Sequence, residues 1–203
     1  LARNGEEGLR KANEEKPDLV VSDVMMPLMS GMEMCMKIKN NIDLCHIPVV
    51  LLTALDSVEY NIEGLQQGAD DYISKPFHAK VLLMRCNNLI RNRLLLKSQL
   101  TKQVDFDVQL LATTSLDQQL LNRIVEIVDL RMGEPDFDVN ALARELNMGR
   151  SSFFTKVKNL TGMTPSEFMQ NQRINRAATL LREQPDLLVN EISDRLGLSL
   201  IHI

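Results

Sequence analysis

The chain has 203 residues, of which 44% are hydrophobic and 25% are charged, and these are ordinary values for a globular protein with a buried core. They exclude a disordered chain. The longest apolar run, around residues 48–55, is far shorter than the roughly 18 residues of a transmembrane helix, so we expect no membrane contact. Residues 1–16 are too polar for a signal peptide. Because the chain starts with Leu1 and not Met, we interpret it as a piece of a longer protein.

The formal net charge is −4, which argues against a protein that coats nucleic acid nonspecifically. The charge is unevenly distributed, however. Residues 105–138 carry two basic and eight acidic side chains, whereas residues 144–182 carry seven basic and two acidic ones. The basic segment is a candidate anion-binding face, and its alternative interpretation is an ordinary solvated face.

The cysteines are Cys35, Cys45 and Cys86, an odd number without metal-ligand spacing. Reduced thiols of this kind are typical of a cytoplasmic protein, so we expect a cytoplasmic location and no zinc site.

The first half of the chain alternates strand-like and helix-like segments. Apolar runs at residues 19–22, 48–54 and 71–74 predict short strands, with helices over 1–15, 31–41, 58–67 and 81–96. Alternation of this kind predicts a parallel sheet with helices on both sides, an α/β fold.

The second half shows helical periodicity throughout. We predict that Ser115 opens a helix by a capping box with Gln118, and that Asp138 caps a second helix. A third helix covers residues 150–161 and ends at Gly162. A capping box at residues 164–167 opens a long helix to about residue 182, and a last short helix covers 189–196. Residues 100–114 are interpreted as a linker.

Polar residues follow each of the apolar strands: Asp23, Thr53 and Lys75. In an open parallel sheet, ligands bind at the carboxyl ends of the strands. A carboxylate there is a candidate phosphoryl acceptor, a lysine can neutralise the added charge, and a threonine hydroxyl can bond the new oxygens. Taken singly, each residue also has a structural interpretation, as a helix cap, a satisfied strand end or a solvated charge.

The motifs PDLVVSDVMMPLMSGME (17–33), PVVLLTA (48–54) and GADDYISKPF (68–77) together resemble the receiver domain of bacterial response regulators over residues 1–95. The resemblance implies that Asp23 accepts a phosphoryl group from a histidine kinase and that Thr53 and Tyr72 are switch residues. It further implies a catalytic role for Lys75, a cis peptide bond between Lys75 and Pro76, and Mg²⁺ held by Asp23 and the backbone carbonyl of Met25.

One feature of the family is missing from this sequence. The first predicted helix matches the family's second, so two of five strands and the acidic pair that completes the magnesium site are absent. We therefore expect an incomplete doubly wound sheet. Our hypothesis is that this stretch is phosphorylated inefficiently, although the intact protein is phosphorylated, because Mg²⁺ normally offsets charge on the transferring group.

The helices predicted over 139–146 and 150–161 have the spacing of a helix-turn-helix unit, whose second helix enters the major groove of DNA. Phe153, Val157 and Leu160 are predicted to face inward. The residues predicted to face DNA are Arg150, Ser151, Phe154, Thr155 and Lys158. An ordinary helical hairpin with a polar outer face is the alternative interpretation.

The segment MGRSSFFTKVKNLTGMTPSEFMQNQRINRAATLL (148–181) resembles the DNA-binding domain of AraC-type transcription regulators, over about residues 115–199. That family has two helix-turn-helix units joined by a long helix. Thr155 stands where the family often has arginine. The second unit ends in residues 200–203, where a second recognition helix would follow, so we expect an all-α domain that is truncated.

A receiver followed by an AraC-type domain resembles the C-terminal part of hybrid two-component regulators. We therefore expect a partial receiver at 1–97, a linker at 98–114 and a partial DNA-binding domain at 115–203. The expected function is phosphorylation-controlled transcription regulation, with double-stranded DNA, a histidine kinase domain and a second copy of the chain as partners. The stretch itself contains no kinase motifs, although the parent chain is a candidate histidine kinase. The alternatives are a receiver that serves phosphotransfer alone and a truncated remnant without function.

Overall fold

The computed structural model describes the chain apart from residues 55–67, 101–106, 113 and 199–203. It divides into two compact units. The first runs from Leu1 to Leu95 and includes the beginning of helix α5 (Ser115–Arg131) as far as Asp117; the second holds Leu96–Ala112 and the chain from Gln118 onward. Helix α5 therefore starts in the first unit and continues in the second.

A three-stranded parallel sheet forms the centre of the first unit. Strands β1 (Val20–Asp23), β2 (Val49–Ala54) and β3 (Asp71–Lys75) are arranged in the order β1-β2-β3. The middle strand is buried along most of its length, as its continuous apolar run predicts. The predicted parallel α/β arrangement is confirmed.

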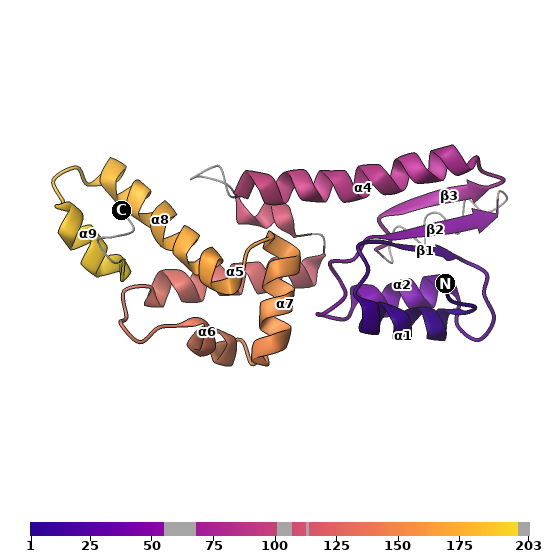
Figure 1. The fold of residues 1–203 in the computed structure, drawn as a ribbon, viewed down its shortest axis with the longest axis horizontal. Helices are drawn as coiled ribbons and strands as arrows, with labels where there is room; N and C mark the ends of the chain where they lie inside the picture. Colours follow the sequence, from indigo (N-terminus) through magenta and orange to yellow (C-terminus); the bar gives the residue numbers. More distant parts are fainter. Residues whose placement is uncertain (55–67, 101–106, 113, 199–203) are drawn as a thin grey trace. The chain divides into compact units, whose positions relative to one another are not determined.

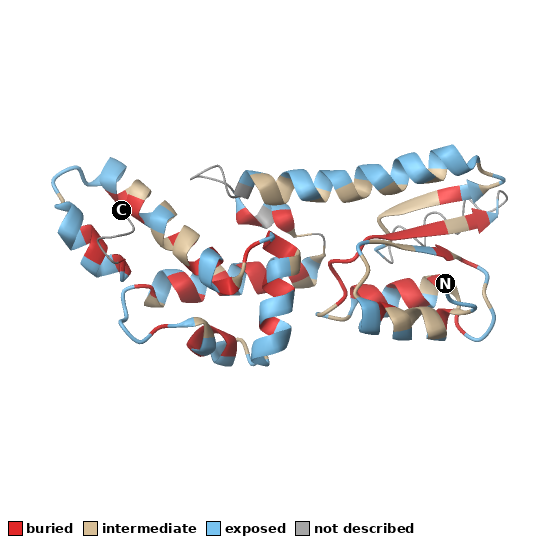
Figure 2. Cartoon of the chain, in the orientation of Figure 1, coloured by how far each residue is buried: buried red, intermediate tan, exposed pale blue. Residues whose placement is uncertain are grey.

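Helices cover both faces of this sheet. Helices α1 (Gly5–Glu15) and α2 (Gly31–Lys39) lie side by side on one face, and α4 (Ala79–Leu100) lies along the other (Figure 1). The apolar cluster of the unit lies beneath α1 and α2, with Met34, Ile38 and Leu51 among its members. Helix α4 is mostly exposed (Figure 2). The helix predicted over 58–67 lies outside the described residues.

The described part of the second unit is entirely helical. Its elements are the short 3-10 helix η1 (Val108–Leu111), the rest of α5, α6 (Val139–Glu145), α7 (Arg150–Thr161), α8 (Pro165–Glu183) and α9 (Val189–Leu196). One apolar cluster joins them, and it includes Val108 and Leu111 from the predicted linker. Throughout the described chain, the helices are too short or too polar to traverse a bilayer.

The helix ends follow local chemistry, with one correction. Thr164 and Glu167 form the predicted capping box of α8, and Gly162 and Gly197 end α7 and α9 in the left-handed conformation. At α5, however, the Asp117 amide donates to Oγ1 of Thr114 over 3.1 Å. Thr114, one residue before the predicted Ser115, is therefore the capping residue, because both side chains are good caps and the sequence alone does not choose between them.

Candidate functional site

Asp23 and Lys75 lie together at the carboxyl end of the sheet. Asp23 is the last residue of β1 and Lys75 is the last residue of β3, and Nζ of Lys75 donates a hydrogen bond to Oδ2 of Asp23. The other carboxylate oxygen, Oδ1, accepts from the amide of Met25 at 3.2 Å. Both side chains remain accessible, at 38% for Asp23 and 42% for Lys75. The peptide bond from Lys75 to Pro76 is cis, as expected.

The environment of Asp23 favours its ionised form. Burial raises the pKa of the carboxyl group. The hydrogen bonds from Lys75 and from the Met25 amide, together with the charge of Lys75, lower this pKa by more than burial raises it. The net result is a pKa below the ordinary value of 3.8. At neutral pH the side chain is therefore an anion with one oxygen facing a lysine, the protonation state that a nucleophile requires.

Thr53 lies near the same edge on β2, whereas Tyr72 is the second residue of β3. Leu52 pairs with Asp23 across β1 and β2, so Thr53, the next residue along β2, lies just beyond it. Thr53 is buried at 5% exposure. The Tyr72 ring packs against the apolar cluster, and its buried hydroxyl has no hydrogen-bond partner within the described residues. Burial raises the pKa of Tyr72 to about 12, so this hydroxyl is protonated.

A glycine that the sequence reasoning missed fixes the backbone at Asp23. Gly31, the first residue of α2, donates its amide to the carbonyl of Val24 at 2.9 Å. A Cβ atom at this position would lie 2.0 Å from the Asp23 carbonyl oxygen, so only glycine fits. The cap of α2, in which Ser30 and Glu33 bond each other's backbone amides, was the sequence signal that could have found it.

The described residues include oxygen donors of the kind that Mg²⁺ binds. Mg²⁺ prefers oxygen ligands in an octahedral arrangement and usually keeps several waters. The Asp23 carboxylate and a backbone carbonyl at Met25 are donors of that kind. No cluster of three or more histidine, cysteine or acidic side chains suited to a metal ion occurs among the described residues, however.

Helices α6 and α7 form the predicted helix-turn-helix arrangement. Asp138 caps α6 by accepting from the amide of Ala141 at 2.8 Å. The chain then turns through Asn147, whose φ of 52° lies in the left-handed region, and the Met148 amide donates to the Ala143 carbonyl at 3.0 Å. The tight turn brings the start of α7 beside α6, so Arg144 and Arg150 line a common hollow.

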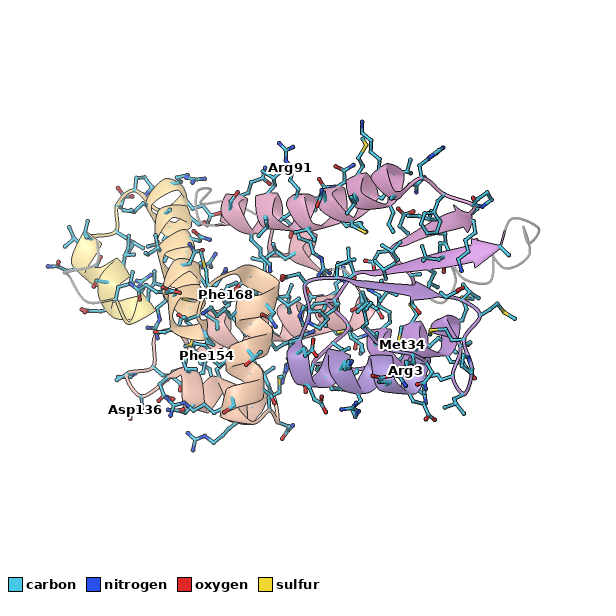
Figure 3. The ribbon with its side chains drawn as sticks, turned by 45° about the vertical axis from the view of Figure 1, so that its right-hand side comes forward. Arg3, Met34, Arg91, Asp136, Phe154 and Phe168 are labelled. Carbon is cyan, nitrogen blue, oxygen red and sulfur yellow. The ribbon has the colours of Figure 1, made fainter. Side chains whose placement is uncertain are left out.

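Helix α7 has an apolar inner face and a polar outer face. Phe153, Val157 and Leu160 are buried, as predicted. The five residues predicted to face DNA are exposed: Arg150, Ser151, Phe154, Thr155 and Lys158. Figure 3 labels Phe154, which is 41% exposed, and Phe168 of α8, which is in the core. Lys156 of the same helix is also buried, which the helical pattern did not predict.

Comparison with known families assigns both regions. Residues 1–87 match the response regulator receiver domain, and residues 142–199 match a helix-turn-helix domain of the AraC type. The chain is a receiver domain followed by an AraC-type helix-turn-helix domain.

Two curated relatives match nearly the whole chain. Histidine kinase P4 of Formosa agariphila is 42% identical over 97% of this chain, which spans 14% of that protein. The probable transcriptional regulator ycf29 of Pyropia yezoensis is 29% identical over 96% of this chain, which spans 82% of that protein. Each of these matches therefore extends over both the receiver region and the helix-turn-helix region of this chain.

Solved receiver domains are similar to the first part of the chain. The receiver of a signal transduction histidine kinase from Syntrophus aciditrophicus is 41% identical, with a TM-score of 0.43, over 45% of this chain and 69% of that one. The receiver of the sensor histidine kinase PA1611 from Pseudomonas aeruginosa PAO1, described with a magnesium ion in its active-site cleft, is 26% identical with a TM-score of 0.41. That match covers 44% of this chain and 74% of the other.

Proposed function

We propose that this chain receives a phosphoryl group on Asp23 and controls transcription through DNA contacts made by α7. The observation that carries the proposal is the accessible Asp23–Lys75 pair at the sheet edge, followed on the same chain by an exposed recognition face. The working boundaries are a receiver at residues 1–97, a connecting segment at 98–114 and a DNA-binding region at 115–203.

The chemistry at Asp23 is a phosphoryl transfer. A carboxylate oxygen attacks the phosphorus of a phosphohistidine; the new O–P bond forms while the N–P bond breaks, and the electron pair returns to the imidazole nitrogen. Lys75 then neutralises charge on the phosphoryl oxygens. Thr53 would donate its hydroxyl to one of those oxygens, and Tyr72 would follow Thr53 inward, which changes the surface of the receiver.

Mg²⁺ belongs to the proposal for the intact receiver. Asp23 and the carbonyl of Met25 would provide two of its oxygen ligands, and the magnesium-containing receiver of PA1611 supports this expectation. When bound, the ion offsets negative charge on the transferring group. Asp23 keeps its role as the nucleophile, and Lys75 keeps its role as the partner cation.

The proposed ligand of α7 is the major groove of double-stranded DNA. Arg150 and Ser151 have donors suited to base edges, and the exposed ring of Phe154 suits a thymine methyl group. Thr155 is a further candidate for base contact. Lys158 would bind phosphate, which positions the helix without reading sequence. The basic balance of residues 144–182 supports an anionic partner.

The proposed protein partners are a histidine kinase domain and a second copy of the chain. The similarity to histidine kinase P4 across 97% of the chain supports a kinase in the same longer protein. Such partners imply a cytoplasmic location. The same similarity favours a second candidate function, in which the receiver acts in phosphotransfer and α7 binds no DNA.

DNA binding by the intact protein tests the first candidate. Arg150→Ala is expected to weaken operator binding by about 1–3 kcal/mol if Arg150 contacts a base. Lys158→Ala should reduce the slope of log affinity against log salt concentration by about one unit. Ser152→Ala is the matched control, because Ser152 is exposed on α7 outside the predicted face. Equal affinities for wild type, Arg150→Ala and Ser152→Ala would reject the assignment.

Phosphoryl transfer separates the two candidates. Asp23→Asn in the intact protein should abolish incorporation of phosphate, whereas Asp18→Asn, at an exposed position before β1, should not. Loss of phosphate in Asp23→Asn together with loss of phosphate-dependent DNA binding supports the transcription regulator. Phosphotransfer by a wild type that binds no DNA selects the second candidate.

A further inference from the structure

Asp117 is a fully buried carboxylate in the first turn of α5. Its exposed fraction is 0%, and its Oδ1 accepts a hydrogen bond from Sγ of Cys45, at 3.2 Å. Both residues belong to the first unit, whereas α5 from Gln118 onward belongs to the second. The contact therefore holds one turn of α5 to the receiver.

A cation on α4 lies within electrostatic reach of this carboxylate. Burial lowers the pKa of the Arg93 guanidinium, while Asp70, Asp117 and Cys45 raise it. A buried carboxylate is stable only when hydrogen bonds and opposite charge compensate for its lost hydration. Asp117 thus connects the segment before β2 with the start of α5, and the charge of Arg93 on α4 acts on it electrostatically.

The Cys45 segment is itself fixed to the sheet. Nζ of Lys39 donates to the carbonyls of Ile47 at 2.9 Å and Cys45 at 3.4 Å, and to the carboxylate of Asp70 at 2.6 Å. Asp70 directly precedes β3, the strand that carries Tyr72 and Lys75. A contiguous set of hydrogen bonds and covalent links therefore runs from the strand of the phosphoacceptor edge to Asp117.

Helix capping alone does not explain the burial of Asp117. An acidic residue in the first turn is favourable near any helix N-terminus, and there it is usually exposed. The cap of α5 is already supplied by Thr114, whose Oγ1 accepts from the Asp117 amide. The carboxylate of Asp117 is directed instead to the Cys45 thiol.

We propose that the hydrogen bond between Asp117 and Cys45 is a regulatory latch that holds the start of α5 to the receiver and transmits its phosphorylation state to the DNA-binding unit. Movement of β3 and α4 on phosphorylation changes the positions of the residues around Asp117. Because α5 continues into the second unit, where Leu121, Ile124 and Val128 are buried in the core, a change in its first turn reaches that core. The latch rests on the proposed function.

The test measures DNA affinity of the intact protein with and without beryllofluoride, a phosphoryl mimic. Couplings of this kind are typically about 5- to 150-fold. Asp117→Asn removes the charge but keeps an acceptor of the same size, and Cys45→Ala removes the donor. We expect Asp117→Asn to reduce the ratio of the two affinities at least about threefold, and Cys45→Ala to reduce it less. Thr114→Ala, which weakens the helix cap and leaves the latch residues in place, is the matched control.

The outcomes separate the latch from the proposed function. If the DNA affinity of the wild-type protein is the same with and without beryllofluoride, the proposed function is wrong, and the latch is wrong with it. If beryllofluoride changes the DNA affinity of the wild type, and changes that of Asp117→Asn and Cys45→Ala as much as that of Thr114→Ala, only the latch is overturned. Hydrogen exchange distinguishes misfolding: the latch requires faster exchange in the first turn of α5 in Asp117→Asn, with protection of α7 and β2 retained.

Discussion

Two lysine–aspartate pairs lie at opposite ends of the same sheet and differ in burial. At the amino ends of the strands, the side chains of Lys39 and Asp70 are 7% and 17% exposed, and their nitrogen and oxygen are 2.6 Å apart. At the carboxyl ends, the side chain of Lys75 is 42% exposed and that of Asp23 is 38% exposed. Both are therefore far more accessible than their counterparts Lys39 and Asp70. The same two residue types therefore occupy very different surroundings.

The difference lies in how many partners each pair has. Lys39 donates to two carbonyls as well as to Asp70, and Asp70 also accepts from the Val49 amide at 2.8 Å. Both charges are thus compensated inside the protein, and the pair joins α2 to β2 and β3. Asp23 has one cation, one amide and open solvent, so its carboxylate remains available to an incoming group. One pair is suited to holding the fold and the other to chemistry.

The largest expected effect is at the buried pair. Lys39→Met leaves the Asp70 carboxylate buried without its cation, and we expect the free energy of unfolding to fall by about 3–5 kcal/mol. Lys75→Met, the matched substitution at the exposed pair, should cost less than about 1 kcal/mol. Urea denaturation of both variants measures the difference. Equal losses would show that the two ends of the sheet are equivalent in stability.

A smaller effect is expected at the glycine behind Asp23. Gly31→Ala places a methyl group against the Asp23 carbonyl, and we expect it to destabilise the receiver by about 1–3 kcal/mol and to slow phosphorylation. Gly149→Ala is the control, because a Cβ there meets no atom within 4 Å. Unfolding and phosphate incorporation are measured together. A Gly31→Ala protein as stable and as active as wild type would contradict the packing argument.

The smallest expected effect is the pH dependence due to Asp23. Its pKa is lower in the folded protein than the ordinary 3.8, so the unfolded chain binds the proton more readily. Ionised Asp23 therefore stabilises the fold above pH 3.8, and this contribution is lost as the pH falls through the lower, folded pKa. Solvent screening at this accessible site keeps it below about 1 kcal/mol. Asp23→Asn should show a flatter stability curve in acid, and an unchanged curve would refute the assigned shift.

Local sequence patterns predicted much of the architecture. All described strands agree with the predicted apolar runs to within one residue, because a short β-branched run between turn residues has few alternatives. The position of Asp23, Thr53 and Lys75 at one edge followed from parallel strands. The inner face of α7 followed from helical spacing.

Long-range partners were not predictable in this way. Lys39 and Asp70 are 31 residues apart, and Cys45 and Asp117 are 72 apart. A lysine or aspartate in a helix is most often solvated, and no local pattern distinguishes the rare buried one. The buried Lys156 on α7 was missed for the same reason.

The amino-acid sequence by itself determined the order of elements, the helix cap at Thr164, and the residue that ends β1 at the carboxyl edge of the sheet. These features depend on side chains within a few positions of one another, so their energetics are local. Only the tertiary structure decided which lysines are buried and which aspartate is buried against Cys45. It also decided that residue 31 has no room for a side chain. Each of those outcomes depends on atoms brought together from distant parts of the chain, where burial sets the free energy of a charge.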